Sequence, residues 1–581
     1  MIKEKLRPYF QALPDVFNYQ IASKALLAVL VFLLGRIFQA LLRSSGRVAV
    51  TSGDWIFLFT TWQGILILLL GLVTLFFYVA FDINSKIIIS RNLLTAQKSS
   101  LSECTIEAVR SIGKLFNLRG IAVVIYITLI APIIGIGVSV SLTEGLYIPT
   151  FITSFIESSV LYSALAGFAV LVFLSVGIAN LFILHGIIVD GLSIGEAGDQ
   201  SRKLIRANWK DYLKQNVVYI LTIALSLAAV AILFLFLPLK LISMLPTGSI
   251  SRFLTIFFVL AGVIISLLTD LFGTPLYLLK MTQLYYSYRQ GSEYAYKEKE
   301  RENRDRYKKA AIAAVIAVIA AVFIIDFNFD KMFPLETNVK VIAHRAGGIE
   351  GPENTISGLE AAQKAGAYGS EIDIQRTKDG AYVILHDGTF KRVAGVKKKP
   401  SEMTLDEIKE LSVDGEPVPV FEDMLAACKG RAVLFTELKG KSADRKMADD
   451  AVKLIRKYQM EDECVLISLK YDVIDYIEST YPDIQTGFLT FASFGNTASL
   501  NCDYIGLEEE SATTDAINSI HTEGKQALVW TPNKKGSQKQ FLCSQADGII
   551  TDKVSQAIGI SEQMLSRSDL DRMVDKIKAI L

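Results

Sequence analysis

The hydrophobic and polar positions divide the chain into two halves of different character. Up to Phe327, long apolar runs alternate with shorter polar segments, and beyond this point short apolar runs alternate with amphipathic stretches. An apolar run of about 18 or more residues is long enough to cross a bilayer as a helix. The pattern therefore predicts a multi-spanning membrane domain over residues 1–327 and a soluble domain over residues 328–581.

Apolar runs of spanning length recur through the first half and predict an all-α transmembrane helical bundle. They number about seven, at residues 25–42, 63–81, 121–141, 161–187, 216–239, 253–279 and 309–326. The stretch 148–156 either lengthens the fourth helix or forms a re-entrant piece, so a count of eight stays open.

The distribution of lysine and arginine between these runs predicts the orientation of the chain. Positive charge is concentrated in the N-terminal segment and in the second, fourth and sixth loops, whereas the loops between them are poor in it. Cytoplasmic loops carry an excess of lysine and arginine. We therefore expect a multi-pass protein of the cell membrane, in contact with the lipid bilayer, with a cytoplasmic N-terminus and an extracytoplasmic domain at 328–581.

The second half alternates strand-like and helix-like runs. The strand-like runs are 340–343, 371–376, 381–386, 432–438, 464–468, 485–489, 503–506, 526–531 and 548–551. This alternation over about 250 residues is typical of an α/β TIM (β/α)8 barrel. The turn that begins at Thr377 is too short for a parallel crossover, so 381–386 is expected to return along 371–376 as a hairpin, which leaves eight barrel strands.

Chemically active side chains follow the first strands of this barrel. Glu371 and Asp373 are two residues apart on one strand, so both side chains leave the same face. The hairpin returns His386 to their level, and His344 ends the preceding strand at the same C-terminal edge. Two imidazoles and two carboxylates are therefore expected to converge at one mouth of the barrel.

A further strand, 433–439, adds Glu437 and Lys439 on one face. Three carboxylates make an oxygen-rich site that suits a hard divalent cation such as Ca²⁺ or Mg²⁺. Lys439 and Arg345 add positive charge, and an anion held by a metal, an arginine and a lysine is most simply a phosphate. His344 and His386 would then act as general acid and base in phosphoester cleavage.

Several motifs in fixed order extend this pattern across the second half. They are HRAGG with ENT at 344–355, EIDIQRTKDG at 371–380, HD at 386–387, ELK at 437–439, SLKYDVI at 468–474, YIGLEEE at 504–510, VWTPN at 529–533 and DGIITD at 547–552. Between about 335 and 560 the chain resembles the glycerophosphodiester phosphodiesterase family. The apolar half is similar to the membrane domain attached to some Gram-positive members of that family.

The resemblance implies a TIM barrel and metal-dependent hydrolysis of glycerophosphodiesters to glycerol 3-phosphate and an alcohol. Matched residue by residue, it implies metal ligands Glu371, Asp373 and Glu437, catalytic His344 and His386, phosphate contacts Arg345 and Lys439, and a pocket residue Glu353 in the ENT motif. Trp530 stands where the family often lines the mouth with an aromatic ring, and a role in the core fits it equally well.

One position departs from the family pattern, because the residue after His-Arg is usually glycine and here it is Ala346. Alanine is costly there if the backbone needs a positive φ.

The sequence leaves alternatives to this function open. They are activity on lysophospholipids or on teichoic-acid glycerophosphate polymers, or a non-catalytic lipid-binding or transport protein of the membrane.

Charge and cysteine content narrow the partners. The net charge is +1 and no nucleic-acid motif is present, so a nucleic-acid partner is not expected. None of the five cysteines forms a CxxC pair, which argues against a zinc cluster. The four in the second half are either free buried thiols or paired in one or two disulfides; they are Cys428, Cys464, Cys502 and Cys543.

Overall fold

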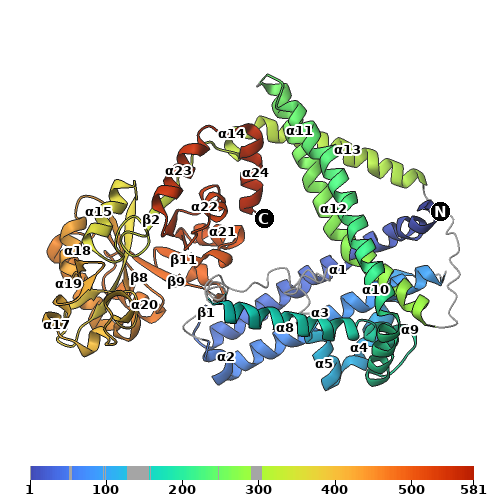
Figure 1. The fold of residues 1–581 in the computed structure, drawn as a ribbon, viewed down its shortest axis with the longest axis horizontal. Coiled ribbons are helices and arrows are strands. Elements are labelled where there is room, and N and C mark those ends of the chain that lie inside the picture. The colour runs from blue at the N-terminus through green and yellow to red at the C-terminus, as the bar shows by residue number, and fades with distance from the viewer. Residues whose placement is uncertain are drawn as a thin grey trace. The chain divides into compact units, whose positions relative to one another are not determined.

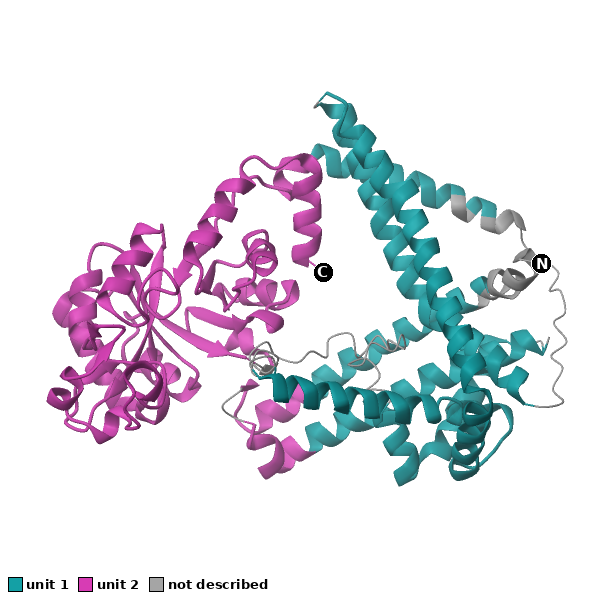
Figure 2. Ribbon diagram, viewed as in Figure 1, with its two compact units in different colours: residues 1–37, 66–327 teal, residues 38–65, 328–581 magenta. Residues whose placement is uncertain are grey.

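The computed structural model describes residues 2–51, 55–95, 97, 100–126, 156, 159–246, 248–289, 304–491 and 493–580. They fall into two compact units (Figure 2). Unit 1 comprises residues 1–37 and 66–327, and unit 2 comprises residues 38–65 and 328–581.

Unit 1 is helical (Figure 1). Its elements are α1 (Ile2–Ser44, whose last residues belong to unit 2), α3 (Trp62–Leu94, whose first residues belong to unit 2), α4 (Leu101–Ile112), α5 (Leu118–Ile125), α8 (Val160–Ala179), α9 (Ile183–Val189), α10 (Ile194–Ala231), a short π-helix at Ile232–Phe236, α11 (Leu237–Ile242), α12 (Ser249–Tyr288) and α13 (Arg304–Phe327).

Five helical segments are long and apolar enough to cross a membrane, which confirms a multi-pass membrane domain. They are Val16–Ser44, Trp62–Leu94, Val160–Val189, Ile194–Ile242 and Ser249–Tyr288, with a shorter apolar helix at Ile312–Phe327. These six segments cover six of the seven expected spans. Most of the remaining run, 121–141, and nearly all of 148–156 lie outside the described residues.

Polar caps mark where two of the unit 1 helices begin. Ser100 accepts a hydrogen bond from the backbone of Glu103, whose carboxylate caps Ser100 in return, and Ser193 and Glu196 repeat this arrangement at the start of α10. Such reciprocal caps satisfy N–H groups that a helix end leaves unpaired. They explain why helices begin in the polar stretches between apolar runs.

The second half of the chain folds into a closed barrel of eight parallel strands, as the sequence predicted. The strands are β2 (Lys340–Ala343), β3 (Gly369–Arg376), β7 (Val433–Leu438), β8 (Cys464–Ser468), β9 (Thr486–Thr490), β11 (Tyr504–Glu508), β12 (Gln526–Trp530) and β13 (Gly548–Thr551). Each pairs with its neighbour in this order, and β13 closes the ring by pairing with β2. β4 (Tyr382–Ile384) runs antiparallel to β3, which confirms the expected hairpin.

Apolar side chains fill the barrel on both faces of its strands. Inside the ring, one cluster is formed by Ile342, Phe435, Val465, Ile467, Leu489, Tyr504, Leu528 and Ile550. Between strands and helices, two larger clusters bury the outward-facing side chains. Burial on both faces explains why these strands read as continuous hydrophobic runs.

The outer layer of the barrel consists of helices, which alternate with the strands as the sequence pattern predicted. They are α15 (Ile356–Lys364), α17 (Leu405–Lys409), α18 (Phe421–Cys428), α19 (Arg445–Tyr458), α20 (Tyr471–Thr480), α21 (Thr514–Thr522), α22 (Lys535–Leu542), α23 (Val554–Met564) and α24 (Asp569–Ile580). The chain between β4 and β7 also forms α16 (Lys391–Ala394) and a small hairpin of β5 (Ser412–Val413) and β6 (Glu416–Pro417), which is not among the strand-like runs of the sequence.

Unit 2 also includes the segment that joins the first two long helices. Its strand β1 (Ala49–Thr51) pairs antiparallel with β10 (Ser493–Gly495), which follows barrel strand β9, and a short helix, α2 (Phe57–Thr60), comes next. The pairing is extended by a hydrogen bond from the backbone N–H of Asn496 to the carbonyl of Val48. A segment distant in sequence is therefore tied to a loop of the barrel.

Candidate active site

The register of the barrel strands brings three carboxylates to one place. Asp373 on β3 lies directly opposite Glu437 on β7, and Glu371 precedes Asp373 by two residues on the same face. Ligand oxygens of the three residues all lie within 4.8 Å of one another. All three side chains are buried.

Burial and mutual repulsion act on the protonation of these groups. Burial, followed by the charges of Asp373 and Glu437, raises the pKa of Glu371 well above its ordinary value. Burial likewise raises the pKa of Glu437 to about 7, although Lys439 opposes the shift. Burial also acts to raise the pKa of Asp373, but Lys439 and His386 outweigh it and hold that pKa below its usual range.

Lys439 is the cation that touches this cluster directly. Its Nζ lies 2.7 Å from Oδ1 of Asp373 and 2.9 Å from Oε2 of Glu437. Burial lowers the pKa of Lys439, but the facing carboxylates raise it further, so the ammonium stays charged. Its partners are therefore the carboxylates, and a phosphate contact from Lys439 would be made from within that cluster.

The two histidines lie near each other beside the carboxylates. Their ring centroids are 6.3 Å apart. Nδ1 of His344 is 2.7 Å from Oδ1 of Asp552, and its Nε2 is 4.0 Å from Oε2 of Glu371. Nδ1 of His386 is 3.1 Å from Oδ1 of Asp387. Each ring thus gives Nδ1 to an aspartate, which leaves Nε2 for other chemistry.

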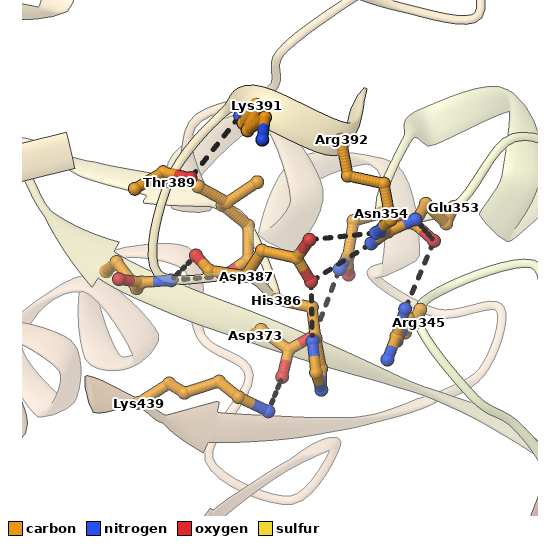
Figure 3. A network of polar contacts seen from close by, with 12 residues as sticks. Arg345, Glu353, Asn354, Asp373, His386, Asp387, Thr389, Lys391, Arg392 and Lys439 are labelled. Carbon is orange, nitrogen blue, oxygen red and sulfur yellow. Dashed lines mark hydrogen bonds and ion pairs between the residues drawn. The ribbon is translucent and has the colours of Figure 1, made fainter. Parts of the chain in front are cut away.

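A network of charges surrounds His386 and Arg345, and Arg392 of α16 lies at its centre (Figure 3). Arg392 donates from Nε to Oδ2 of Asp387 at 2.8 Å and from Nη1 to Oε2 of Glu353 at 2.9 Å. Glu353 also accepts from Nη1 of Arg345 at 3.2 Å. Arg392 therefore links the aspartate behind His386 to the glutamate behind Arg345.

The turn after β2 requires positive φ angles, which favour glycine over a residue such as Ala346. Arg345 and Ala346 have φ of +51° and +66°, which is the left-handed region. The turn is held by the N–H of Arg345, which donates to Oε2 of Glu371 at 2.8 Å, and by Ser370, whose hydroxyl donates to the carbonyl of Ala346 at 2.8 Å. Gly348 follows, where an added Cβ would lie 2.3 Å from the carbonyl oxygen of Asp552.

A cleft of about 400 Å³ opens beside this cluster, and its lining includes His386, Glu437 and Lys439. Trp530 does not line it. The indole of Trp530 donates from Nε1 to the carbonyl of Gly506 at 3.1 Å and packs, half-buried, against the cluster inside the barrel. The other eight residues singled out from the sequence lie together around the carboxylates.

Four polar residues of this site were not singled out from the sequence. Asn354 donates to Oδ2 of Asp373 at 2.9 Å. Asp552 contacts His344, and Asp387 contacts His386. Arg392 in turn donates to Asp387. Asp552 directly follows the last barrel strand, so its place at the shared C-terminal edge was open to inference. Arg392 comes from a lysine-rich segment whose pattern indicates no element.

The donor set fits a divalent cation. Three buried carboxylates face one another with one lysine to offset them, and all the donor atoms are oxygens, which hard cations prefer. Two further buried atoms, Nε of Arg345 and Oδ1 of Asn354, have no hydrogen-bond partner in the described part of the chain. Buried atoms left unpaired in this way are found at sites that take up water, an ion or a substrate.

Comparison with known protein families shows to which family the chain belongs. The family model "Membrane domain of glycerophosphoryl diester phosphodiesterase" matches residues 2–324, which is more than half of the chain. The "Glycerophosphoryl diester phosphodiesterase family" model matches residues 344–556. The chain belongs to the glycerophosphodiester phosphodiesterases that carry a membrane domain.

The chain has relatives that are named glycerophosphodiester phosphodiesterase. It is 26% identical to the glycerophosphodiester phosphodiesterase of Caldanaerobacter subterraneus over 239 residues, which is 38% of this chain and 96% of the relative. It is 25% identical to that of Bacillus altitudinis over 242 residues, which is 39% of this chain and 99% of the relative. A solved phosphodiesterase from Parabacteroides distasonis shares 25% identity, with a TM-score of 0.36, over 39% of this chain and 98% of that one.

Membership of the family settles the class of reaction. The protein is a phosphoric diester hydrolase that acts on glycerophosphodiesters, and its N-terminal half is the family's membrane domain. The alternative that the chain is non-catalytic is therefore wrong.

Proposed function

We propose that the protein hydrolyses glycerophosphodiesters to glycerol 3-phosphate and an alcohol at the outer face of the cell membrane, with a divalent cation held by Glu371, Asp373 and Glu437. The single observation that carries this proposal is the convergence of these carboxylates with two histidines at one end of a closed barrel. When bound, such a cation polarises phosphoryl oxygens and offsets the charge that develops on them.

The side chains of the site then divide the remaining work. Nε of Arg345 has no partner in the described part of the chain and is suited to a phosphate oxygen. His344 and His386 each present Nε2 because an aspartate engages Nδ1, so one can take the proton of the nucleophile and the other can give a proton to the leaving alkoxide.

Cation-dependent turnover tests the assignment directly. Full-length protein in detergent is stripped with a chelator, and release of glycerol 3-phosphate from glycerophosphocholine is measured with and without Mg²⁺, Ca²⁺ or Mn²⁺. We expect no turnover without a cation, and recovery with at least one. Undiminished turnover after chelation would remove the cation from the proposal.

Histidine variants test the catalytic pair. His344→Ala and His386→Ala are expected to abolish turnover while the melting temperature stays close to that of the parent. His521→Ala is the matched control, because His521 contacts Asp547 outside the site and should retain activity. Near-normal activity in either site variant would refute the assignment.

The natural substrate is expected to be one that the outer cell surface provides. Deacylated phospholipids are the first candidates, with lysophospholipids and glycerophosphate polymers of the teichoic-acid type as alternatives. Rates on glycerophosphocholine, lysophosphatidylcholine and polyglycerophosphate, measured side by side, rank the three classes.

Two observations support the outward orientation of the barrel. The segment between the first two long helices is poor in lysine and arginine, as outer loops are. That segment supplies strand β1, which pairs with β10 of the barrel unit, so both must lie on one side of the bilayer.

Labelling of intact cells with a membrane-impermeant thiol reagent tests this orientation. Lys397→Cys places an exposed thiol in the barrel domain, and Ser102→Cys places one in the loop expected inside. We expect Lys397→Cys to react in intact cells and Ser102→Cys to react only after lysis. The reverse pattern would place the barrel in the cytoplasm.

A further inference from the structure

A cavity of about 640 Å³ lies among the helices of unit 1 and shares no residue with the phosphodiester site. Its volume falls within the range of roughly 300–1,000 Å³ that is typical of small-molecule sites. The walls come from α3, α5, α8, α9 and α10, with Leu278 of α12. Nothing in the hydrolysis reaction uses this space.

The lining is amphipathic. Most of the wall is aliphatic, with Ile83, Ile87, Val123, Leu181, Leu184 and Ile194 among its members. Polar groups also contribute, and the charged ones are Arg119, Asp199 and Arg202. Two cations against one carboxylate leave this cavity with an excess positive charge. Its chemistry is therefore that of a site for an apolar molecule with an anionic group.

Arg119 is the cation available to such a group. Arg202 is engaged, because it lies 2.6 Å from Asp199 and donates to Asn180 at 3.0 Å. No hydrogen bond or ion pair engages Arg119 within the part of the chain that the structure describes. Its Nη1 lies 3.0 Å from where a Cβ of Gly195 would stand, so the guanidinium rests against the first turn of α10.

His185 adds a second unmet polar group in the wall. Its side chain is 2% exposed, and its Nε2 is 3.2 Å from the hydroxyl of Thr282. Nδ1 is buried and has no hydrogen-bond partner among the described residues. The hydroxyl of Thr282 donates to the carbonyl of Leu278, so it accepts from Nε2 of His185, and Nδ1 is left as an acceptor. Buried polar atoms are normally paired, so this nitrogen is suited to a hydroxyl donor that a ligand brings into the cavity.

We propose that this cavity binds a phospholipid of the surrounding bilayer, with the phosphate at Arg119, a head-group hydroxyl near His185 and an acyl chain along the aliphatic wall. All the wall helices except α5 belong to segments long and apolar enough to cross the membrane, so lipid is the amphiphile at hand. A small soluble phosphate would leave most of the apolar wall uncovered, which disfavours it.

Lipid retention by the full-length protein tests the proposal. Protein in dodecyl maltoside is titrated with phosphatidylglycerol, and bound lipid is counted by native mass spectrometry. Arg119→Gln removes the free cation, and Val123→Trp fills the cavity from α5. Arg206→Gln is the matched control, since it removes an exposed arginine of α10 that does not line the cavity.

We expect about tenfold weaker lipid binding for Arg119→Gln, the size of effect that loss of one charge-assisted hydrogen bond produces. Val123→Trp should lose the bound lipid, and Arg206→Gln should bind as the parent does. All three should keep the parent's turnover of glycerophosphocholine, which shows that the protein is folded.

Two results would overturn the proposal. One is equal lipid binding by Arg119→Gln, Val123→Trp and Arg206→Gln, which would place the lipid elsewhere on the protein. The other is displacement of the lipid by free glycerol 3-phosphate at the same concentration, which would make the occupant a small soluble anion. Neither result depends on the cation or the histidines of the barrel.

Discussion

At the scale of single residues, Ala346 is the position of the active site that departs from the family pattern. A left-handed conformation costs a non-glycine residue roughly 1–2 kcal/mol. Its methyl group is fully buried, which returns about 0.8 kcal/mol. Alanine also loses less backbone entropy on folding than glycine, by roughly 0.5–1 kcal/mol. The terms nearly cancel, so alanine at this position is compatible with the left-handed turn.

Ala346→Gly should therefore change little. We expect the free energy of unfolding to shift by less than about 1 kcal/mol and the turnover to stay near that of the parent. Denaturant unfolding of the solubilised protein and the glycerophosphocholine assay measure both. A large rise in activity would show that alanine impairs the site.

Asp552 is the residue behind His344, and its replacement should separate positioning from folding. Burial raises the pKa of Asp552, but the hydrogen bond with His344 outweighs it, so the carboxylate stays ionised and holds Nδ1. We expect Asp552→Asn to lower kcat by roughly 10–100-fold, the usual cost of losing such a partner. Asp547→Asn, which alters the His521 pair instead, is the control and should leave kcat unchanged.

The cysteines resolve an alternative that the sequence left open, since all five are free thiols. Burial raises the pKa of Cys428, Cys464 and Cys502 to about 12. A raised thiol pKa keeps the group protonated and unreactive below that value. At pH 8 we expect iodoacetamide to spare these three in the native protein and to modify them after denaturation, as peptide mass mapping would show.

At the scale of elements, α16 has a larger part than its four residues suggest. It carries Arg392, which holds Asp387 and Glu353 together and so connects the supports of His386 and Arg345 (Figure 3). The helix occupies a segment that the sequence pattern left without structure. Its contribution comes from a few charged contacts, for which hydrophobic periodicity carries no signal.

Arg392→Gln should weaken the site without unfolding the barrel. We expect kcat/KM to fall by about tenfold, because two carboxylates lose a shared partner and the groups behind them lose their fixed positions. Lys391→Gln, the neighbouring change in the same helix, should have no effect. Equal activity of the two variants would show that catalysis does not depend on the contacts of Arg392 with Asp387 and Glu353.

Strands were predicted more accurately than the site contacts they support. Each expected strand appears within a few residues of its place, because burial on both faces leaves a continuous apolar run in the sequence. The hairpin that aims His386 followed from the length of one turn. Asn354 and Arg392 were missed because their roles depend on loop conformations that tertiary contacts determine.

At the scale of the whole molecule, the two units differ in what the sequence says about them. Hydropathy fixes the number of membrane helices only approximately, since five segments are long enough, one is short and one lies mostly outside the described residues. The packing of helices within a bilayer leaves little periodic pattern in the sequence. The cavity around Arg119 and His185 was therefore not predicted. The barrel, by contrast, was predictable from its alternation of strands and helices.

All the residues of the phosphodiester site lie between 344 and 552. Whether the barrel domain hydrolyses substrate without the membrane domain can therefore be tested. We expect the fragment 328–581, with its eight strands intact, to hydrolyse soluble glycerophosphocholine at a rate comparable to that of the full chain. Rates per folded molecule are compared after the fragment's folding is checked by circular dichroism. An inert but folded fragment would mean that the first 327 residues contribute to chemistry.

The contact between His344 and Asp552 joins residues 208 positions apart, across the seam where β13 meets β2. One member of this pair is made early in synthesis of the barrel and the other at the end of its last strand. A chain that ends before β13 therefore lacks both the closing strand and the partner of His344. The site is therefore complete only when the ring of strands is closed.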